Sequence, residues 1–287
     1  MKTLMCLFLL CQMVFAGPFD AGWKKFNEAM EKDLPQSAIT ELKSIDAAAR
    51  AQKSWPDALR ATAYRLMLDS QIEEGDVSLL INSLEKEIAD GPQEMKSVLQ
   101  TMQALWLWAY FQEEQWQIME RTAVADDAST DLKTWDLKRM MREIDARFAK
   151  SLALAEPLKD VPLSSYETLL EKGNIPAEVM PSMYDFLMQQ ALAFYQADER
   201  VDAAAEDDFL LDPTSPAFAA RAEFLAWKPQ APASLLHKIR AITLYQQLLN
   251  HHQDRLPARI YVDVKRLQWA RSEEHTSELQ SLACISY

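Results

Sequence analysis

Hydrophobic residues recur at steps of three and four along almost the whole chain, which is the spacing of one face of an α-helix. The main sets are Ile39, Leu42, Ile45 and Ala49; Val77, Leu80, Ile81, Leu84 and Ile88; Met95, Val98, Leu99, Met102, Trp106 and Ala109; Leu137, Met141, Ile144, Phe148 and Leu152; Met180, Met183, Leu187, Ala191 and Phe194; Leu235, Ile239, Ile242 and Leu249; and Ile260, Val264 and Leu267. No alternating apolar and polar run is long enough to indicate a β-strand. The pattern predicts an all-α fold in which each set is buried on one side of a helix.

Residues typical of helix ends separate these sets. They are Gly75 before Asp76, Gly91 before Pro92, a possible capping box at Ser54 and Asp57, and a capping box at Ser164 and Glu167 with Gly173 placed to end its short helix. Because the connections are short, we expect successive helices to pack as antiparallel hairpins. Such repeat-like stacking resembles that of tetratricopeptide proteins, although their Trp-x-x-Leu-Gly-x-x-Tyr pattern and a fixed repeat period are missing.

The two ends of the chain differ from the rest. Residues 1–16 have a basic start at Lys2, an apolar run and the small-x-small pattern Val14-Phe15-Ala16, which predict a signal peptide cleaved after Ala16. The run is shorter than the roughly 20 residues that span a bilayer. We therefore expect an exported protein, in the periplasm or on the cell surface, with no membrane span after cleavage.

Residues 271–287 read as the in-frame translation of a common DNA-sequencing adapter followed by a sample barcode. We therefore expect the native sequence to differ beyond Ala270 and the parent protein to continue. On this interpretation a docked helix reaches about Ala270 and a mobile tail follows it.

Between these ends the sequence predicts two helical units. Residues 17–197 form a helical domain, and residues 198–232 form an acidic, proline-rich connection that a short helix around residues 218–227 interrupts. Residues 233–270 begin a second helical unit, which is truncated.

Composition narrows the possible chemistry. The chain has a net charge of −13, which favours solubility over a phosphate-binding surface for nucleic acid. The three cysteines, Cys6, Cys11 and Cys284, all lie in the two end segments. The segment between them therefore has no disulfide, thiol nucleophile or cysteine metal site.

Three groups of residues are candidate sites. His237, His251 and His252 lie on one expected helix, where neighbouring side chains diverge by about 100°, so surface histidines near a helix C-terminus are favoured over a metal site. The acidic cluster lacks the alternation and the central Gly of an EF-hand and is interpreted as a solvated loop; it comprises Asp198, Glu199, Asp202, Glu206, Asp207, Asp208 and Asp212. The densest aromatic stretch has helical spacing and no basic residues between its members, so core packing is favoured over stacking on sugars or bases; it comprises Trp106, Trp108, Tyr110, Phe111 and Trp116.

No Gly-rich phosphate loop, Ser elbow or His-Glu-x-x-His motif occurs. We therefore assign no catalytic, cofactor-binding or metal-binding residue and expect that the chain is not an enzyme.

Two stretches resemble large bacterial alpha-2-macroglobulin-like proteins. Residues 183–195, with Ile175-Pro176 before them, resemble that family's Pro-x-Leu-Tyr-Asp-Phe-Leu-x-x-x-Ala-Leu-x-Phe-Phe segment. Residues 241–249 and 259–267 are similar to its Ala-Leu-x-Leu-Tyr-Gln-x-Leu and Asp-Ala-Asp-Leu-x-Arg-Leu patterns, and residues 23–26, 33–38 and 58–66 also resemble its N-terminus. Departures are Gln189 and Gln190, in place of a His-Arg or His-Glu pair, and Val264, where the family pattern has Asp-Leu.

The resemblance implies a non-catalytic N-terminal helical domain for interaction or anchoring, followed in the parent protein by β-sandwich macroglobulin domains. The partners it implies are the remainder of that chain and the proteases that the parent traps. Some family members carry a Cys-x-x-Gln thioester and a bait region, neither of which occurs here. The alternative is a stand-alone helical-repeat scaffold or adaptor in the bacterial envelope.

Overall fold

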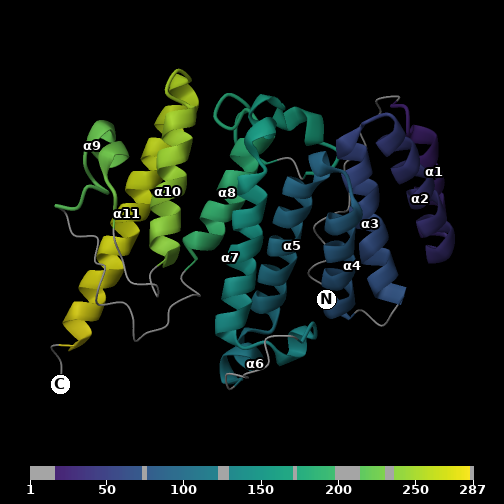
Figure 1. Ribbon diagram of the computed structural model, residues 1–287, viewed down its shortest axis with the longest axis horizontal. Helices are drawn as coiled ribbons and strands as arrows, with labels where there is room; N and C mark the ends of the chain where they lie inside the picture. The colour runs from purple at the N-terminus through teal and green to yellow at the C-terminus, as the bar shows by residue number, and fades with distance from the viewer. Residues whose placement is uncertain are drawn as a thin grey trace. The chain divides into compact units, whose positions relative to one another are not determined.

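The computed structural model describes residues 17–72, 76–121, 129–170, 173–197, 214–229 and 236–284, and over these residues the predicted all-α fold is confirmed, with no strand. The chain divides into two compact units, unit 1 up to Asn174 and unit 2 from Ile175 onwards (Figure 1). The division differs from the expected one, because α8 (Met183–Tyr195) lies in unit 2 and packs on α10 (Leu236–His251). The acidic cluster between residues 198 and 212 lies outside the described residues.

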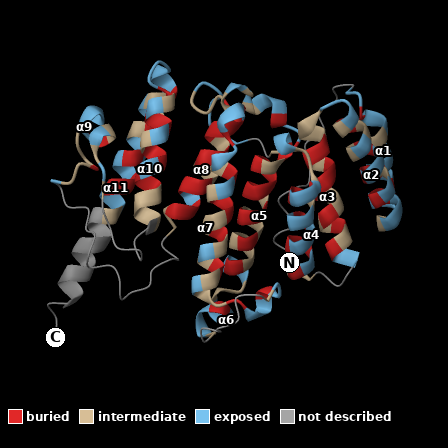
Figure 2. Ribbon diagram, viewed as in Figure 1, coloured by how far each residue is buried: buried red, intermediate tan, exposed pale blue. Residues whose placement is uncertain are grey.

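The described part of unit 1 contains seven α-helices. They are α1 (Asp20–Glu31), α2 (Pro35–Ala51), α3 (Trp55–Ile72), α4 (Val77–Asp90), α5 (Gln93–Glu113), α6 (Gln115–Glu120) and α7 (Leu137–Ala153). Consecutive helices from α1 to α5 pack on each other, and α7 packs on α5. Figure 2 shows the buried positions of α3 and α5 in red, with half-buried positions in tan between them. The residue sets expected on α2 and α4 are buried apart from Val77, which is half-buried. Asp76 caps α4 as predicted, since its carboxylate accepts a hydrogen bond from the Ser78 amide.

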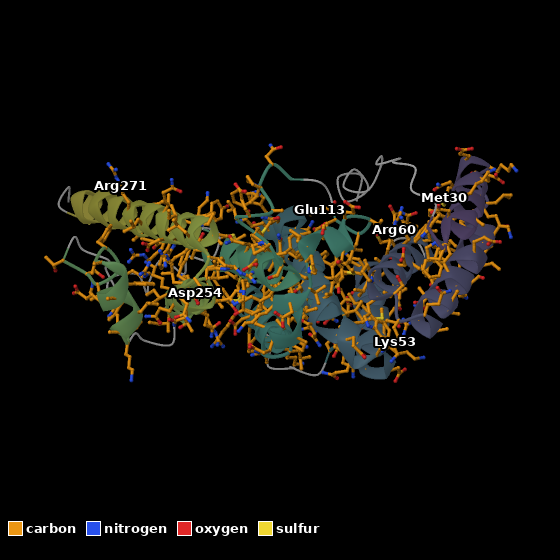
Figure 3. The ribbon with its side chains drawn as sticks, turned by 90° about the horizontal axis from the view of Figure 1, so that it is seen from above. Met30, Lys53, Arg60, Glu113, Asp254 and Arg271 are labelled. Atoms are coloured by element: carbon orange, nitrogen blue, oxygen red, sulfur yellow. The ribbon has the colours of Figure 1, made fainter. Side chains whose placement is uncertain are left out.

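The turns after α1 and α2 share one conformation. Asp33 and Lys53 have φ values of 54° and 56°, in the left-handed region. The next amide in each turn reaches back to the carbonyl five residues earlier, from Leu34 to Ala29 at 2.9 Å and from Ser54 to Ala49 at 2.8 Å. These are Schellman turns in which a side chain occupies the position usually taken by Gly. Figure 3 labels Lys53 at the second turn.

Polar side chains help to hold the helices of unit 1 together. The Arg50 guanidinium of α2 donates to Asp46 at 2.7 Å and to Glu87 of α4 at 2.5 Å, and Arg65 of α3 binds the other Glu87 oxygen at 2.8 Å. Burial opposes the charge of Arg50, but its hydrogen bonds to Asp46 and Glu87 outweigh this and raise its pKa. Where α5 meets α7, the buried Ser151 hydroxyl donates to the Ser97 carbonyl at 2.8 Å and lies 2.7 Å from the Thr101 hydroxyl.

Unit 2 contains α8, α9 (Arg221–Ala226), α10 and α11 (Leu256–Cys284). The α10 helix packs on each of the other three. The short helix expected around residues 218–227 is present as α9. No described helix in either unit is both long and apolar enough to cross a membrane.

The structure corrects three local predictions. Ser164 lies in a 3₁₀ turn (Leu163–Tyr166) that ends before Glu167, so the expected capping box starts no α-helix. Ile260, Val264 and Leu267 do not form the buried face of α11, because they are 52%, 45% and 37% exposed. The helix also continues past Ala270 to Cys284, since residues 271–284 contain no Pro or Gly to end it.

The first turn beyond Ala270 is docked on α10. The Glu273 carboxylate accepts a hydrogen bond from the Trp269 indole at 3.1 Å and pairs with Lys238 at 2.9 Å. The expected tail therefore begins no earlier than Glu273.

Candidate functional site

A cluster of one carboxylate and two imidazoles in unit 2 is the strongest candidate site. It consists of Asp185, His251 and His252, whose potential ligand atoms all lie within 4.8 Å of one another. Asp185 and His252 are 2% and 1% exposed, and His251 is half-buried. The cluster lies where the first turn of α8 meets the end of α10.

The capping box that starts α8 fixes the carboxylate. The Ser182 side chain accepts a hydrogen bond from the Asp185 amide at 3.3 Å. In return the Asp185 Oδ2 accepts one from the Ser182 amide at 3.0 Å and one from its hydroxyl at 2.6 Å. This arrangement uses Oδ2 and leaves Oδ1 directed away from the cap.

The Asp185 Oδ1 lies 2.7 Å from the His252 Nε2. Burial by itself would raise the pKa of Asp185, but the hydrogen bonds from His252 and Ser182 outweigh burial and lower it. The other ring nitrogen of His252, Nδ1, is buried and has no hydrogen-bond partner among the described residues. Among the described residues, the imidazole is therefore hydrogen-bonded through Nε2 alone.

The end of α10 presents both histidines to the same region. The His252 amide still donates to the Leu248 carbonyl at 2.9 Å, and the chain then turns through Asp254, which Figure 3 labels. The His251 ring lies with its centroid 4.5 Å from that of His252, and it makes an edge contact with Tyr184 at 5.1 Å.

The geometry corrects the interpretation of the histidines as surface residues. His252 is in the core, and the two neighbouring side chains converge on Asp185 rather than diverging. His237 lies near the start of α10, far from this cluster along the helix. The sequence pattern Ser182-x-x-Asp185 could have revealed the capping box, but the pairing with His252 joins residues 67 positions apart.

The aromatic stretch is only partly buried. Phe111 is fully buried, as core packing predicts, whereas Trp106, Trp108 and Tyr110 are half-buried. Trp116 lies on α6 and is 81% exposed, so the core interpretation is wrong for this residue.

The cluster does not have the geometry of a nucleophilic triad. In such a triad the imidazole lies between the hydroxyl and the carboxylate, and it takes the hydroxyl proton. Here the Ser182 hydroxyl donates to the carboxylate. Two of its three residues lie in the core, so the cluster can join helices or bind an ion.

Comparison with known proteins adds no assignment: no family model, curated protein or solved structure matches the chain.

Proposed function

We propose that this chain is a non-catalytic helical interaction domain, the N-terminal accessory part of an exported alpha-2-macroglobulin-like protein. The observation that carries the proposal is an exposed apolar stripe on α11. The stripe consists of Leu256, Ile260, Val264 and Leu267, which are 54%, 52%, 45% and 37% exposed. Its occupant in the parent protein is the chain that follows Ala270.

The spacing of the stripe makes it one continuous surface. Steps of four, four and three residues place the side chains along one side of a helix. The opposite side of α11 is buried within unit 2 through Ala258, Val262 and Trp269. Contiguous exposed apolar surface is typical of a site that another protein segment covers. Unit 2 therefore already has a packed face on α11, and the stripe is a second face.

The two stretches that carry the family resemblance also pack against each other. Asp185, in the first stretch, contacts His252, which lies just beyond residues 241–249 of the second stretch. Gln196, directly after the first stretch, contacts Tyr245 within the second. These residues are thereby engaged in holding α8 to α10. This supports a structural module rather than a substrate site.

The alternative, a stand-alone scaffold or adaptor in the envelope, has one observation in its favour. Trp116 and Met119 on α6 are 81% and 53% exposed, which gives unit 1 an apolar surface of its own. An adaptor would use this surface for a separate protein partner.

The first experiment is to sequence the native gene beyond Ala270 from an independent library. We expect different residues after Ala270 and a long continuation with β-patterned domains. An early stop codon would favour the alternative. Recovery of residues 271–287 as genomic sequence would overturn the adapter interpretation.

The second experiment uses the full chain and the first domain encoded by that continuation, expressed separately. We expect them to bind, and Val264→Asp to weaken binding at least tenfold while leaving the melting temperature of the chain nearly unchanged, because Val264 is 45% exposed. Val262→Asp is the matched control: this side chain is 2% exposed, so the substitution lowers the melting temperature itself. Absence of binding, or binding insensitive to Val264→Asp, would contradict the proposed occupant.

The third experiment concerns activity. We expect the full chain at stoichiometric concentration neither to hydrolyse common substrates nor to slow trypsin. Inhibition of trypsin by the chain alone would contradict a purely accessory role.

A further inference from the structure

We propose that Asp185, His251 and His252 bind a divalent transition-metal ion of the Zn²⁺ type, which links the start of α8 to the end of α10 within unit 2. This site is independent of the proposed function. It rests on the proximity of three potential ligand atoms, one from each residue, within 4.8 Å of one another.

The donor set suits this class of ion. Imidazole nitrogens and a carboxylate oxygen are ordinary ligands of Zn²⁺, and three protein ligands leave one position for water or another donor. Mg²⁺ and Ca²⁺ prefer sites made of oxygen alone, so two imidazoles argue against them.

Only small movements are needed to admit the ion. At metal–ligand bonds of about 2.0–2.1 Å, the ligand atoms of a tetrahedral site lie about 3.3 Å apart. The Asp185 Oδ1 and the His252 Nε2 are 2.7 Å apart and must separate slightly, while the His251 nitrogen must approach from within 4.8 Å. No hydrogen bond from a described residue to the His252 Nδ1 has to break for this adjustment. A turn follows His252, so its backbone is not inside a long helix.

The surroundings of the carboxylate match those of a metal ligand. Ligating carboxylates are usually oriented by hydrogen bonds from neighbouring groups. Two hydrogen bonds from Ser182, at 2.6 and 3.0 Å, hold Oδ2 and direct Oδ1 towards the histidines. The rings of His251 and His252 have centroids 4.5 Å apart, close to the roughly 5 Å expected of two imidazoles bound to one tetrahedral ion.

The competing explanation is a structural Asp185–His252 pair with His251 beside it by chance. His251 separates the two explanations, because it is not part of that pair. His251→Ala removes one metal ligand and leaves the Asp185–His252 contact in place. His237→Ala is the matched control, since it removes another half-buried histidine from the same helix outside the cluster.

The test is zinc titration of the full chain by isothermal calorimetry after treatment with EDTA, with Co²⁺ absorption spectroscopy as a second readout. We expect one equivalent of Zn²⁺ to bind, a higher melting temperature with the ion, and visible Co²⁺ bands of a four-coordinate site. His251→Ala should lower the Zn²⁺ affinity at least tenfold and abolish the Co²⁺ bands. His237→Ala should leave both the Zn²⁺ affinity and the Co²⁺ bands unchanged. Absence of zinc binding would overturn the proposal, as would zinc binding that His251→Ala leaves intact or that His237→Ala weakens equally.

Discussion

The buried guanidinium of Arg266 gives the most informative test of unit 2. Arg266 is 2% exposed, and its Nη1 donates to the carbonyls of Ala217 and Ala219, each at 3.1 Å. Its Nη2 pairs with Asp263 at 2.8 Å, and its guanidinium carbon lies 4.4 Å from the centre of the Phe224 ring. One side chain thus joins α11 to the segment that precedes α9.

The expected cost of Arg266→Met follows from what the substitution leaves behind. Methionine keeps much of the aliphatic stem but removes all hydrogen bonds. The Ala217 carbonyl loses a donor in a buried setting, at a cost of about 1–3 kcal/mol. Ala219 is half-buried, so water can partly replace its lost contact, whereas the Asp263 Oδ1 that pairs with Arg266 is buried. Burial also lowers the pKa of Arg266 despite the neighbouring Asp263, so part of the loss is offset when the charge is removed. We expect a net destabilisation of about 2–3 kcal/mol.

The measurement is urea unfolding of the full chain, followed by tryptophan fluorescence, together with hydrogen exchange of residues 214–229. Arg266→Met should lower the unfolding midpoint and speed exchange in that segment. Arg255→Met is the control: Arg255 is exposed just before α11, so its loss should change stability by less than about 0.5 kcal/mol. If Arg266→Met also left the unfolding midpoint unchanged, the cost of burying the charge would equal the gain from its contacts. The guanidinium would then not stabilise the packing of this segment on α11.

Two further predictions concern a tyrosine and a turn. Burial raises the pKa of Tyr245 from 10.0 to about 12, although a hydrogen bond from Gln196 opposes this. Because the pKa of Tyr245 is higher in the folded than in the unfolded chain, its contribution to stability is complete below pH 10 and falls by an amount on the order of 3 kcal/mol as the pH rises through 12. Urea unfolding at increasing alkaline pH should show this decline, and Tyr245→Phe should flatten it. An equal decline in the variant would contradict the assignment to Tyr245. Lys53→Gly should stabilise unit 1 by about 1 kcal/mol, because Lys53 has a φ of 56°. Lys43→Gly within α2 should cost about 1 kcal/mol, and thermal unfolding in which both changes destabilise would refute the reasoning.

The helices of unit 1 could be predicted because their signals are local. Ile39, Leu42 and Ile45 face the core at the spacing that the sequence displays. The start of α4 could be predicted for the same reason, since the side chain of an N-cap such as Asp76 needs only the backbone amide two residues ahead. The prediction of a helix start at Ser164 was wrong, because a capping pattern stabilises a helix only where the following residues continue it. Here the following residues form a 3₁₀ turn.

The cluster of Asp185 and His252 could not be predicted, because it is a tertiary contact. Histidine occurs both in cores and on surfaces, so its burial cannot be read from its type. The pairing depends on how α8 and α10 pack, which neither helix determines alone. The spacing of His251 and His252 was misleading, because their side chains converge where α10 ends.

The error in α11 bears on what this helix does. Periodicity identified Ile260, Val264 and Leu267 as one face and predicted that this face is buried, whereas all three side chains are exposed. Unit 2 covers the other side of the helix, which contains Trp269 and the buried charge of Arg266. That side is less apolar in sequence, yet its polar groups have hydrogen-bond partners: the Arg266 guanidinium donates to a backbone carbonyl and the Trp269 indole donates to a carboxylate. Fully burying an exposed aliphatic side chain contributes about 1.5–3 kcal/mol, so covering the exposed half of each of these side chains would contribute about 1 kcal/mol. A helix with one side packed in unit 2 and one exposed aliphatic side is suited to lie between two bodies, and the Val262 and Val264 variants separate those two sides experimentally.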